Sequence, residues 1–267
     1  MTRPEIAAAI DARGSLLCVG LDPVLDRLPE GIRRDADGVA DFCRRVIDAT
    51  LDLAVAYKPN LAFFECLGPA GMEAFAKTCA HVPDTHLLIA DAKRGDIGNT
   101  ALRYAETFYD RYGCHAVTVA PYMGEDSVRP FLRPGRFAVV LALTSNAGSA
   151  DFEQVDMHDG RPLWEHVVER CARWGSPDEL MLVTGATKAA DFTRVRALAP
   201  EHFLLVPGIG AQGGDLEGVL RRGRTADGGL LVNSSRGILY ASRGADFAAA
   251  SRAAAQSLVD DMRAVAI

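Results

Sequence analysis

The chain has 267 residues, of which 49% are hydrophobic and 24% are charged, and its formal net charge is −6. This length fits one large domain or two small ones. Because α/β barrels of about 250 residues form a single unit, we expect one domain over residues 1–267. A mildly acidic chain without a basic run is not typical of proteins that bind nucleic acid or an anionic membrane. No apolar stretch reaches the roughly 18 residues that span a bilayer, so we expect a soluble protein.

The cysteine and histidine patterns indicate a cytoplasmic protein without a metal site. No Cys-x-x-Cys pair is present, and the N-terminus lacks the basic-then-apolar pattern of a signal peptide. We therefore expect free thiols in a reducing cytoplasm. The histidines show no metal-ligand spacing, so we expect no metal ligand among them. The cysteines are Cys18, Cys43, Cys66, Cys79, Cys114 and Cys171.

Short apolar runs alternate along the chain with amphipathic segments. The runs predict eight strands, near 16–21, 53–58, 86–91, 116–120, 137–143, 180–184, 203–207 and 229–233. The segments between and after them predict helices near 41–51, 70–80, 98–112, 164–174, 188–198, 215–222 and 247–265. Strict strand-then-helix alternation at this length favours the α/β class, as a closed (β/α)8 TIM barrel, over an open doubly wound sheet.

One long polar connection, over 145–162, follows the fifth predicted strand. A loop of this length usually covers another part of the molecule. Its acidic side chains are expected to be solvated. They are Asp151, Glu153, Asp156 and Asp159.

A charged run, DAKRGDI over 91–97, follows the third predicted strand. Side chains two apart on a strand share a face, so Asp91 and Lys93 are predicted to form a buried or half-buried ion pair. Gly95 allows a sharp turn that brings Asp96 close to both. A catalytic cluster is one interpretation of this run, and a structural rim of ion pairs is the other.

Polar side chains also follow other predicted strands. Asp22 follows the first strand, Lys58 ends the second, and Thr144, Ser145 and Asn146 follow the fifth. A turn-forming Asp-Pro pair and a lysine at a strand end each have ordinary structural explanations. In a barrel, however, the carboxyl ends of all strands meet at one rim, where active sites lie. The sequence therefore predicts a candidate active site at this rim.

Two loops after the last strands are rich in glycine. The run PGIGAQGG over 207–214 contains Gln212 and Gly213, and the run NSSRG over 233–237 contains Arg236 and Gly237. Glycines let backbone N–H groups approach an anion closely, and loops after strands seven and eight form the usual phosphate site of barrels. Arg236 adds a permanent charge and Gln212 a neutral donor. The alternative is that the glycines only form tight turns.

The combination of these motifs, in this order, resembles the orotidine 5′-phosphate decarboxylase family, in particular its longer bacterial branch. The resemblance is carried by Asp22, Lys58, the DxKxxDI run with Thr100 beyond it, the PGIGAQGGD loop and Arg236-Gly237. It implies decarboxylation of orotidine 5′-monophosphate to uridine 5′-monophosphate, without metal or organic cofactor. It also implies that Lys93 is the catalytic proton donor.

The resemblance further assigns the substrate contacts. It implies that Lys58, Asp91, Lys93 and Asp96 form a charged network, and that Asp22 and Lys58 contact the ribose hydroxyls. The glycine-rich loops, with Gln212, Gly213, Arg236 and Gly237, would bind the phosphate. Ser145 would contact the pyrimidine amide, with Thr144 and Asn146 as adjacent alternatives. Asp96, Ile97 and Thr100 would enter the neighbouring subunit's site, which makes the expected assembly a homodimer.

Two other functions are alternatives to this reading. Sugar-phosphate decarboxylases and aldolases of the related barrel branch share the DxKxxD pattern but bind Mg²⁺, with a carboxylate where this chain has Lys58. An ammonium cannot ligate Mg²⁺, which takes oxygen donors, so Lys58 disfavours them. A silent nucleotide-binding protein would be expected to have lost Lys93 or one of the aspartates, and all are present.

Overall fold

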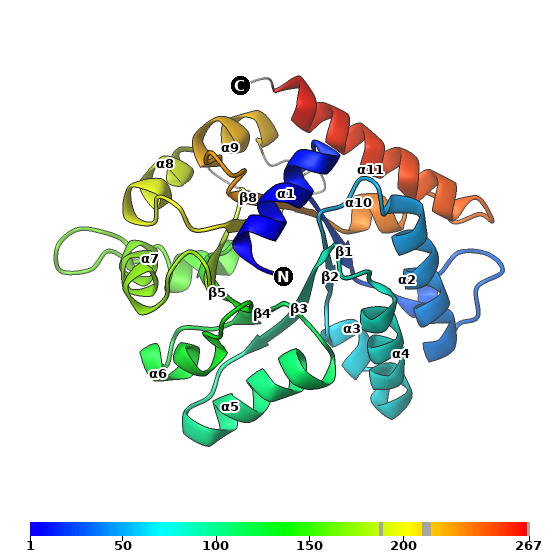
Figure 1. The fold of residues 1–267 in the computed structure, drawn as a ribbon, viewed down its shortest axis with the longest axis horizontal. Helices are drawn as coiled ribbons and strands as arrows, with labels where there is room; N and C mark the ends of the chain where they lie inside the picture. The colour runs from blue at the N-terminus through cyan, green and yellow to red at the C-terminus, as the bar shows by residue number, and fades with distance from the viewer. Residues whose placement is uncertain (187–188, 210–214, 266–267) are drawn as a thin grey trace.

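Eight parallel strands close into a barrel in the computed structural model, which describes residues 1–186, 189–209 and 215–265. Each strand pairs with the next in chain order, and β8 pairs with β1 (Figure 1). The predicted (β/α)8 barrel is confirmed. The strands are β1 (Leu17–Leu21), β2 (Ala56–Pro59), β3 (Leu87–Arg94), β4 (Ala116–Val119), β5 (Phe137–Leu143), β6 (Leu180–Thr184), β7 (Leu204–Val206) and β8 (Leu230–Ser234).

Helices form a ring around the strands (Figure 1). The predicted helices are present, but the helix expected over 98–112 divides into an α-helix and a π-helical turn, η2 (Thr107–Arg111). The α-helices are α1 (Arg3–Arg13), α2 (Ala36–Thr50), α3 (Ala62–Glu65), α4 (Gly68–His81), α5 (Gly98–Glu106), α6 (Glu125–Val128), α7 (Leu163–Trp174), α8 (Ala189–Leu198), α9 (Leu216–Gly223), α10 (Arg236–Leu239) and α11 (Phe247–Ala264). Short 3-10 turns are η1 (Leu25–Arg27), η3 (Arg129–Phe131) and η4 (Ala147–Asp151).

The strands are buried on both faces, because helices cover the outside of the barrel and side chains fill its interior. Every residue of β1, β2, β4, β6, β7 and β8 is buried. Strand β3 departs from this pattern at its carboxyl end, where Lys93 is exposed and Arg94 is half-buried. The predicted charged run therefore lies where the barrel opens to water.

The six cysteines are all free thiols, as the sequence predicts. Five are buried and Cys66 is exposed. Burial raises the pKa of Cys18 to about 12, so this thiol stays protonated at neutral pH. Among the described helices, none has the length and apolar character that crossing a bilayer requires.

Helix α1 was not expected from the periodicity of the sequence, and it covers the amino ends of the strands. Thr2 and Glu5 form a capping box at its start, which satisfies exposed backbone N–H groups. Arg3 pairs with Asp227, just before β8, at 2.6 Å, and its guanidinium lies over the Phe203 ring, just before β7. Helix α1 therefore closes the end of the barrel opposite the predicted active site.

His115 at this closed end makes folding stability depend on pH. Burial, the N-terminal amine and Arg136 lower the pKa of His115 from 6.5 to about 4. As pH falls from 6.5 towards 4, the unfolded chain takes up a proton that the folded chain does not, so stability falls. The ring is partly exposed and water screens part of the effect, so we expect a loss of about 1–2 kcal/mol.

Urea unfolding of the wild type and of His115→Asn across this pH range measures the effect. Asparagine retains an acceptor for the Leu88 N–H, which donates to His115 Nδ1 at 3.1 Å. We expect its stability to fall less steeply with pH, and His158→Asn, in the exposed loop, serves as the matched control. Equal slopes for the wild type and His115→Asn would contradict the assignment.

Candidate active site

Asp91 lies at the centre of the charged cluster, near the carboxyl end of β3. Its Oδ2 accepts a hydrogen bond from Lys58 Nζ at 2.6 Å, and its Oδ1 accepts one from Lys93 Nζ at 2.6 Å. The side chains of Asp91 and Lys58 are 9% and 7% exposed, whereas that of Lys93 is 53% exposed. The predicted ion pair between Asp91 and Lys93 is confirmed, and Lys58 joins it from β2.

These ion pairs fix the charge of the buried groups. Burial by itself would raise the pKa of Asp91, but the ammonium groups of Lys58 and Lys93 hold that pKa well below its usual range. Burial would likewise lower the pKa of Lys58, but the carboxylates of Asp91 and Asp22 outweigh it and raise that pKa. Asp91 and Lys58 are therefore both charged at neutral pH, and Lys93 faces a fixed anion.

Strand β3 bulges at this point. Ala90 pairs with Val117 and Arg94 pairs with Val119, so four residue steps on β3 lie against two steps on β4. Lys93 has a φ of 46°, in the left-handed region, and it is the only non-glycine residue with positive φ in the part of the chain that the structure describes. The Asp91–Lys93 pair thus forms across a bulge, and not along the regular strand that the sequence predicted.

Asp22, at the end of β1, lies beside Lys58 with one oxygen available. Its Oδ2 accepts a hydrogen bond from Ser235 Oγ at 2.6 Å, while its Oδ1 is buried and has no partner in the described chain. Gly20 makes this approach possible, since a Cβ there would lie 2.8 Å from the Ser235 Cβ. A buried acceptor without a donor is costly, so Asp22 Oδ1 is suited to a hydroxyl group of a ligand.

A cavity of about 210 Å³ joins these side chains to the loops after β7 and β8. Arg236 and Gly237 face it from the loop after β8, and Gly208, with a φ of +95°, turns the chain after β7. Gln212 and Gly213, the other two predicted phosphate contacts, lie outside the described residues. The lining residues are Asp22, Lys58, Asn60, Asp91, Pro207, Gly208, Ile209, Asn233, Ser234, Ser235, Arg236 and Gly237.

Asp96 does not join the ion pairs within one chain. Its Oδ1 accepts from the Ile97 N–H at 2.8 Å, and no ion pair forms between it and either lysine. The prediction that the turn at Gly95 brings Asp96 close to Asp91 and Lys93 is therefore not met within a single subunit. Ile97, 52% exposed, and Thr100, also exposed, follow it on the surface.

In the connection after β5, the Ser145 hydroxyl is the one available to bind a ligand. Thr144 Oγ1 donates to Glu153 Oε1 at 2.8 Å and also lies 2.6 Å from Asn146 Oδ1. The Thr144 N–H donates to Glu153 Oε2 at 2.7 Å, so the prediction that Glu153 is merely solvated is wrong. Ser145 is half-buried, and its backbone lies against Gly185 after β6.

Several residues of this site were given no individual role from the sequence. Asn233 lines the cavity, and its Oδ1 accepts a weak hydrogen bond from the Cys18 thiol at 3.6 Å. Thr118, on β4, touches both Asp91 and the backbone of Lys93. A polar residue inside an apolar strand, as in AVTV, was the available signal for Thr118. The sequence signal that could have identified Asn60 and Ser234 was their position directly at a strand end.

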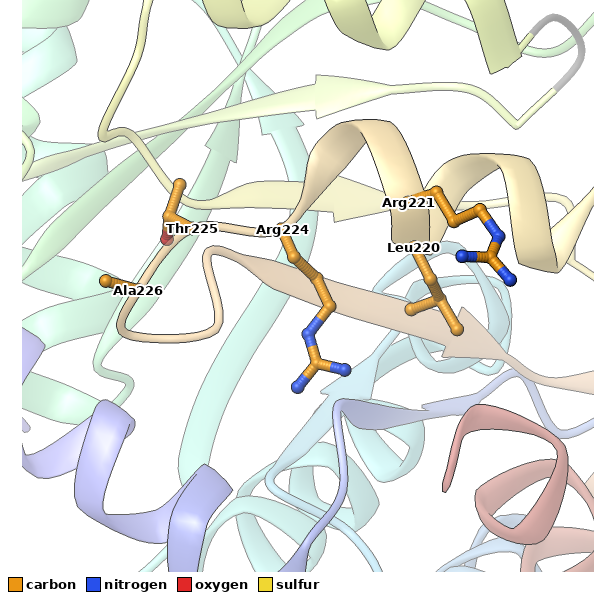
Figure 2. Close-up of a pocket in the computed structure, with 5 residues that line it drawn as sticks. All are labelled: Leu220, Arg221, Arg224, Thr225 and Ala226. Atoms are coloured by element: carbon orange, nitrogen blue, oxygen red, sulfur yellow. The ribbon is translucent and has the colours of Figure 1, made fainter. Parts of the chain in front are cut away.

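The described residues hold no metal cluster, and a larger cavity lies elsewhere in the fold. Within the described residues, no group of three or more histidine, cysteine, aspartate or glutamate side chains could hold a metal ion. A larger cavity, of about 560 Å³, lies beside the end of α9 and is lined in part by Arg221, Arg224 and Thr225 (Figure 2). Thr225 precedes β8, so this cavity lies towards the closed end of the barrel, away from Asp91.

Comparison with known proteins identifies the family of this chain. The sequence model described as "Orotidine 5'-phosphate decarboxylase / HUMPS family" matches residues 15–253. The chain belongs to this family. The resemblance inferred from the motifs is thereby confirmed.

Members of the orotidine 5′-phosphate decarboxylase family match nearly the whole chain. Orotidine 5′-phosphate decarboxylase of Bacteroides fragilis (strain YCH46) is 46% identical over 266 residues, which cover 98% of this chain and 97% of that protein. The structure of Leishmania donovani OMP decarboxylase has a TM-score of 0.86 and 40% identity, covering 99% of this chain and 98% of that one. Leishmania donovani UMP synthase has a TM-score of 0.87 and 42% identity, but the match covers 98% of this chain and 55% of that one.

Proposed function

We propose that this protein converts orotidine 5′-monophosphate to uridine 5′-monophosphate and carbon dioxide, a step of pyrimidine biosynthesis. The observation that carries the proposal is the buried Asp91 carboxylate, which holds Lys58 and Lys93 at 2.6 Å beside a cavity at the barrel rim. Relatives that share 46% identity over 98% of the chain bear the name of this decarboxylase, which supports the same assignment.

The reaction needs a fixed cation and a proton donor at C6 of the pyrimidine. When the bond from C6 to the carboxylate breaks, carbon dioxide leaves and the electron pair stays on C6, in an in-plane orbital that the ring cannot delocalise. The Lys93 ammonium stabilises this pair and then transfers a proton to C6, and a proton from water restores the ammonium. This chemistry requires neither metal nor organic cofactor.

The remaining polar groups bind the two ends of the substrate. Asp22 Oδ1, which has no hydrogen-bond donor in the described chain, accepts a hydrogen bond from a ribose hydroxyl, and Lys58 contacts a ribose oxygen. Arg236 and Gly237 bind the phosphate together with Gln212 and Gly213. Binding energy from the phosphate, remote from C6, assembles the charged site around the reacting carbon.

Ser145 contacts the pyrimidine amide. The hydrogen bonds of the neighbouring residues support this assignment. The Thr144 hydroxyl already bonds Glu153 and lies beside Asn146 Oδ1. The Ser145 hydroxyl has no such partner in the described chain and remains available for a ligand.

The working assembly in this proposal is a homodimer in which Asp96, Ile97 and Thr100 reach the neighbouring subunit's site. Two features of the single chain support it. The Asp96 carboxylate makes no ion pair with Lys93 of its own chain, and the large apolar side chain of Ile97 is 52% exposed. Leu102, Tyr122 and Met123 are exposed as well, and large exposed apolar patches mark interaction surfaces.

A Mg²⁺-dependent sugar-phosphate reaction is the competing function, and Lys58 disfavours it. The Lys58 ammonium lies 2.6 Å from Asp91 Oδ2, at the end of β2. A metal ion beside Asp91 would compete with the Lys58 ammonium for this carboxylate. The ammonium has no oxygen atom that could coordinate the metal.

A two-substrate assay distinguishes these functions. Purified protein is mixed with orotidine 5′-monophosphate, or with 3-keto-L-gulonate 6-phosphate plus Mg²⁺, and products are identified by NMR. We expect uridine 5′-monophosphate from the first mixture and no decarboxylation in the second. Turnover of the sugar phosphate alone would contradict the proposal.

Arg236→Ala is expected to weaken both substrate binding and turnover. Losing one hydrogen bond to a charged group costs about 1.5–3 kcal/mol, so kcat/KM should fall about 10- to 150-fold. Arg222→Ala, at another exposed arginine, is the matched control and should leave kcat/KM unchanged. Added phosphite dianion should activate a substrate that lacks the phosphate. An Arg236→Ala variant with unchanged kcat/KM would contradict the phosphate assignment.

A further inference from the structure

The hydroxyl of Thr118, on β4, contacts the bulge of β3. Thr118 Oγ1 accepts a hydrogen bond from the Lys93 N–H at 2.9 Å and donates one to Asp91 Oδ1 at 3.1 Å. Thr118 is 1% exposed and its bond to Asp91 is buried, so water does not compete for that bond. One side chain on β4 therefore contacts both the backbone of the proposed proton donor and the carboxylate that faces it.

A neutral hydroxyl is suited to this place because it accepts and donates at once. Valine has the same shape as threonine and can do neither, whereas serine can do both. Without the hydroxyl, the Lys93 N–H would lose its hydrogen-bond acceptor, and the buried Asp91 Oδ1 would keep only its bond from Lys93 Nζ.

The bulge is held on both sides of Lys93 by main-chain bonds. The carbonyl of Asp91 accepts from the Leu61 N–H at 3.1 Å, and the carbonyl of Arg94 accepts from the Ala120 N–H at 2.9 Å. Between these points Lys93 has a φ of 46°, which costs energy for a residue with a Cβ. The Thr118 hydroxyl supplies the hydrogen bond that holds the Lys93 N–H in this conformation.

We propose that Thr118 is a positioning residue, which holds the strained backbone of Lys93 and the carboxylate of Asp91 in the arrangement that catalysis needs. This inference rests on the proposed function. The Thr118 hydroxyl bonds the Lys93 backbone and the Asp91 carboxylate, so Thr118 acts through these two residues. Its loss should therefore affect the chemical step and leave substrate binding unchanged.

Thr118→Val tests this directly. Displacing a catalytic group by about 1 Å can lower the rate about 100-fold, so we expect kcat on orotidine 5′-monophosphate to fall about 10- to 100-fold with KM unchanged. Thr118→Ser, which retains the hydroxyl, should keep kcat within about threefold of the wild type. Thr78→Val, at another buried threonine on α4, is the matched control and should have wild-type kcat.

Hydrogen exchange of the Lys93 amide gives a readout that does not depend on turnover. We expect this amide to exchange faster in Thr118→Val than in the wild type, Thr118→Ser or Thr78→Val, because its acceptor is gone. This measurement applies even if orotidine 5′-monophosphate is not the substrate, which separates failure of the inference from failure of the proposed function.

Three results would overturn the positioning role in a protein that turns over orotidine 5′-monophosphate. They are wild-type kcat in Thr118→Val, an equal loss in Thr118→Ser, and a rise in KM without a fall in kcat. Unchanged exchange of the Lys93 amide in Thr118→Val would overturn it regardless of substrate.

Discussion

Lys93→Ala is expected to lower kcat on orotidine 5′-monophosphate by at least about 10⁴-fold while the protein keeps its fold. In the proposed mechanism the variant loses both the cation that stabilises the C6 electron pair and the group that protonates it, and each effect is worth about 10²-fold or more. The fold should survive, because the Lys93 side chain is 53% exposed and Asp91 keeps its bond to Lys58.

Lys77→Ala is the matched control for this variant. Lys77 pairs with Asp37 at 2.9 Å on the surface, and removing an exposed pair of this kind changes stability little. We expect wild-type kcat for Lys77→Ala, and similar melting temperatures for both variants. A Lys93→Ala protein with kcat within about tenfold of the wild type would remove Lys93 from the mechanism.

Mixing two inactive variants is expected to restore activity. If the proposed shared site is right, Lys93→Ala and Asp96→Ala should each be inactive as homodimers, since one would lack the proton donor and the other the carboxylate that reaches the neighbouring site. A heterodimer has one site with both lesions and one intact site. Equal random mixing makes about half of the dimers heterodimeric, so about a quarter of wild-type activity should return.

This mixture is prepared by unfolding and refolding the two variants together, with each variant refolded alone as the control. If Lys93 and Asp96 acted in the same subunit, every site in the mixture would carry a lesion. Activity of the mixture no higher than that of the separate variants would therefore contradict the shared site.

Much of the fold could be predicted from the sequence because strand and helix periods differ clearly. Buried runs such as Leu180–Thr184 and Phe137–Leu143 are continuous and apolar, as parallel strands covered on both faces must be. Helix α1 was missed because only Ile6, Ala9 and Ile10 are buried along it, so its apolar periodicity is weak. The Thr2–Glu5 capping box was the readable signal.

The candidate site was predictable where it follows from strand ends, and not where it depends on local backbone geometry. Asp22, Lys58 and Asp91 meet because parallel strands bring their carboxyl ends to one rim. The bulge that places Lys93 depends on register against β4, which strand periodicity does not reveal. The bond from Thr144 to Glu153 likewise joins residues through a loop whose path has no periodic signal.

We expect this chain's own side chains to decarboxylate orotidine 5′-monophosphate without a metal. The most direct measurement is kcat for protein that has been exhaustively treated with a chelator, with uridine 5′-monophosphate and carbon dioxide both quantified. We predict that kcat equals that of untreated protein and that one carbon dioxide is released for each product molecule. Activity that disappears with the chelator and returns with Mg²⁺, or no product under either condition, would contradict the account.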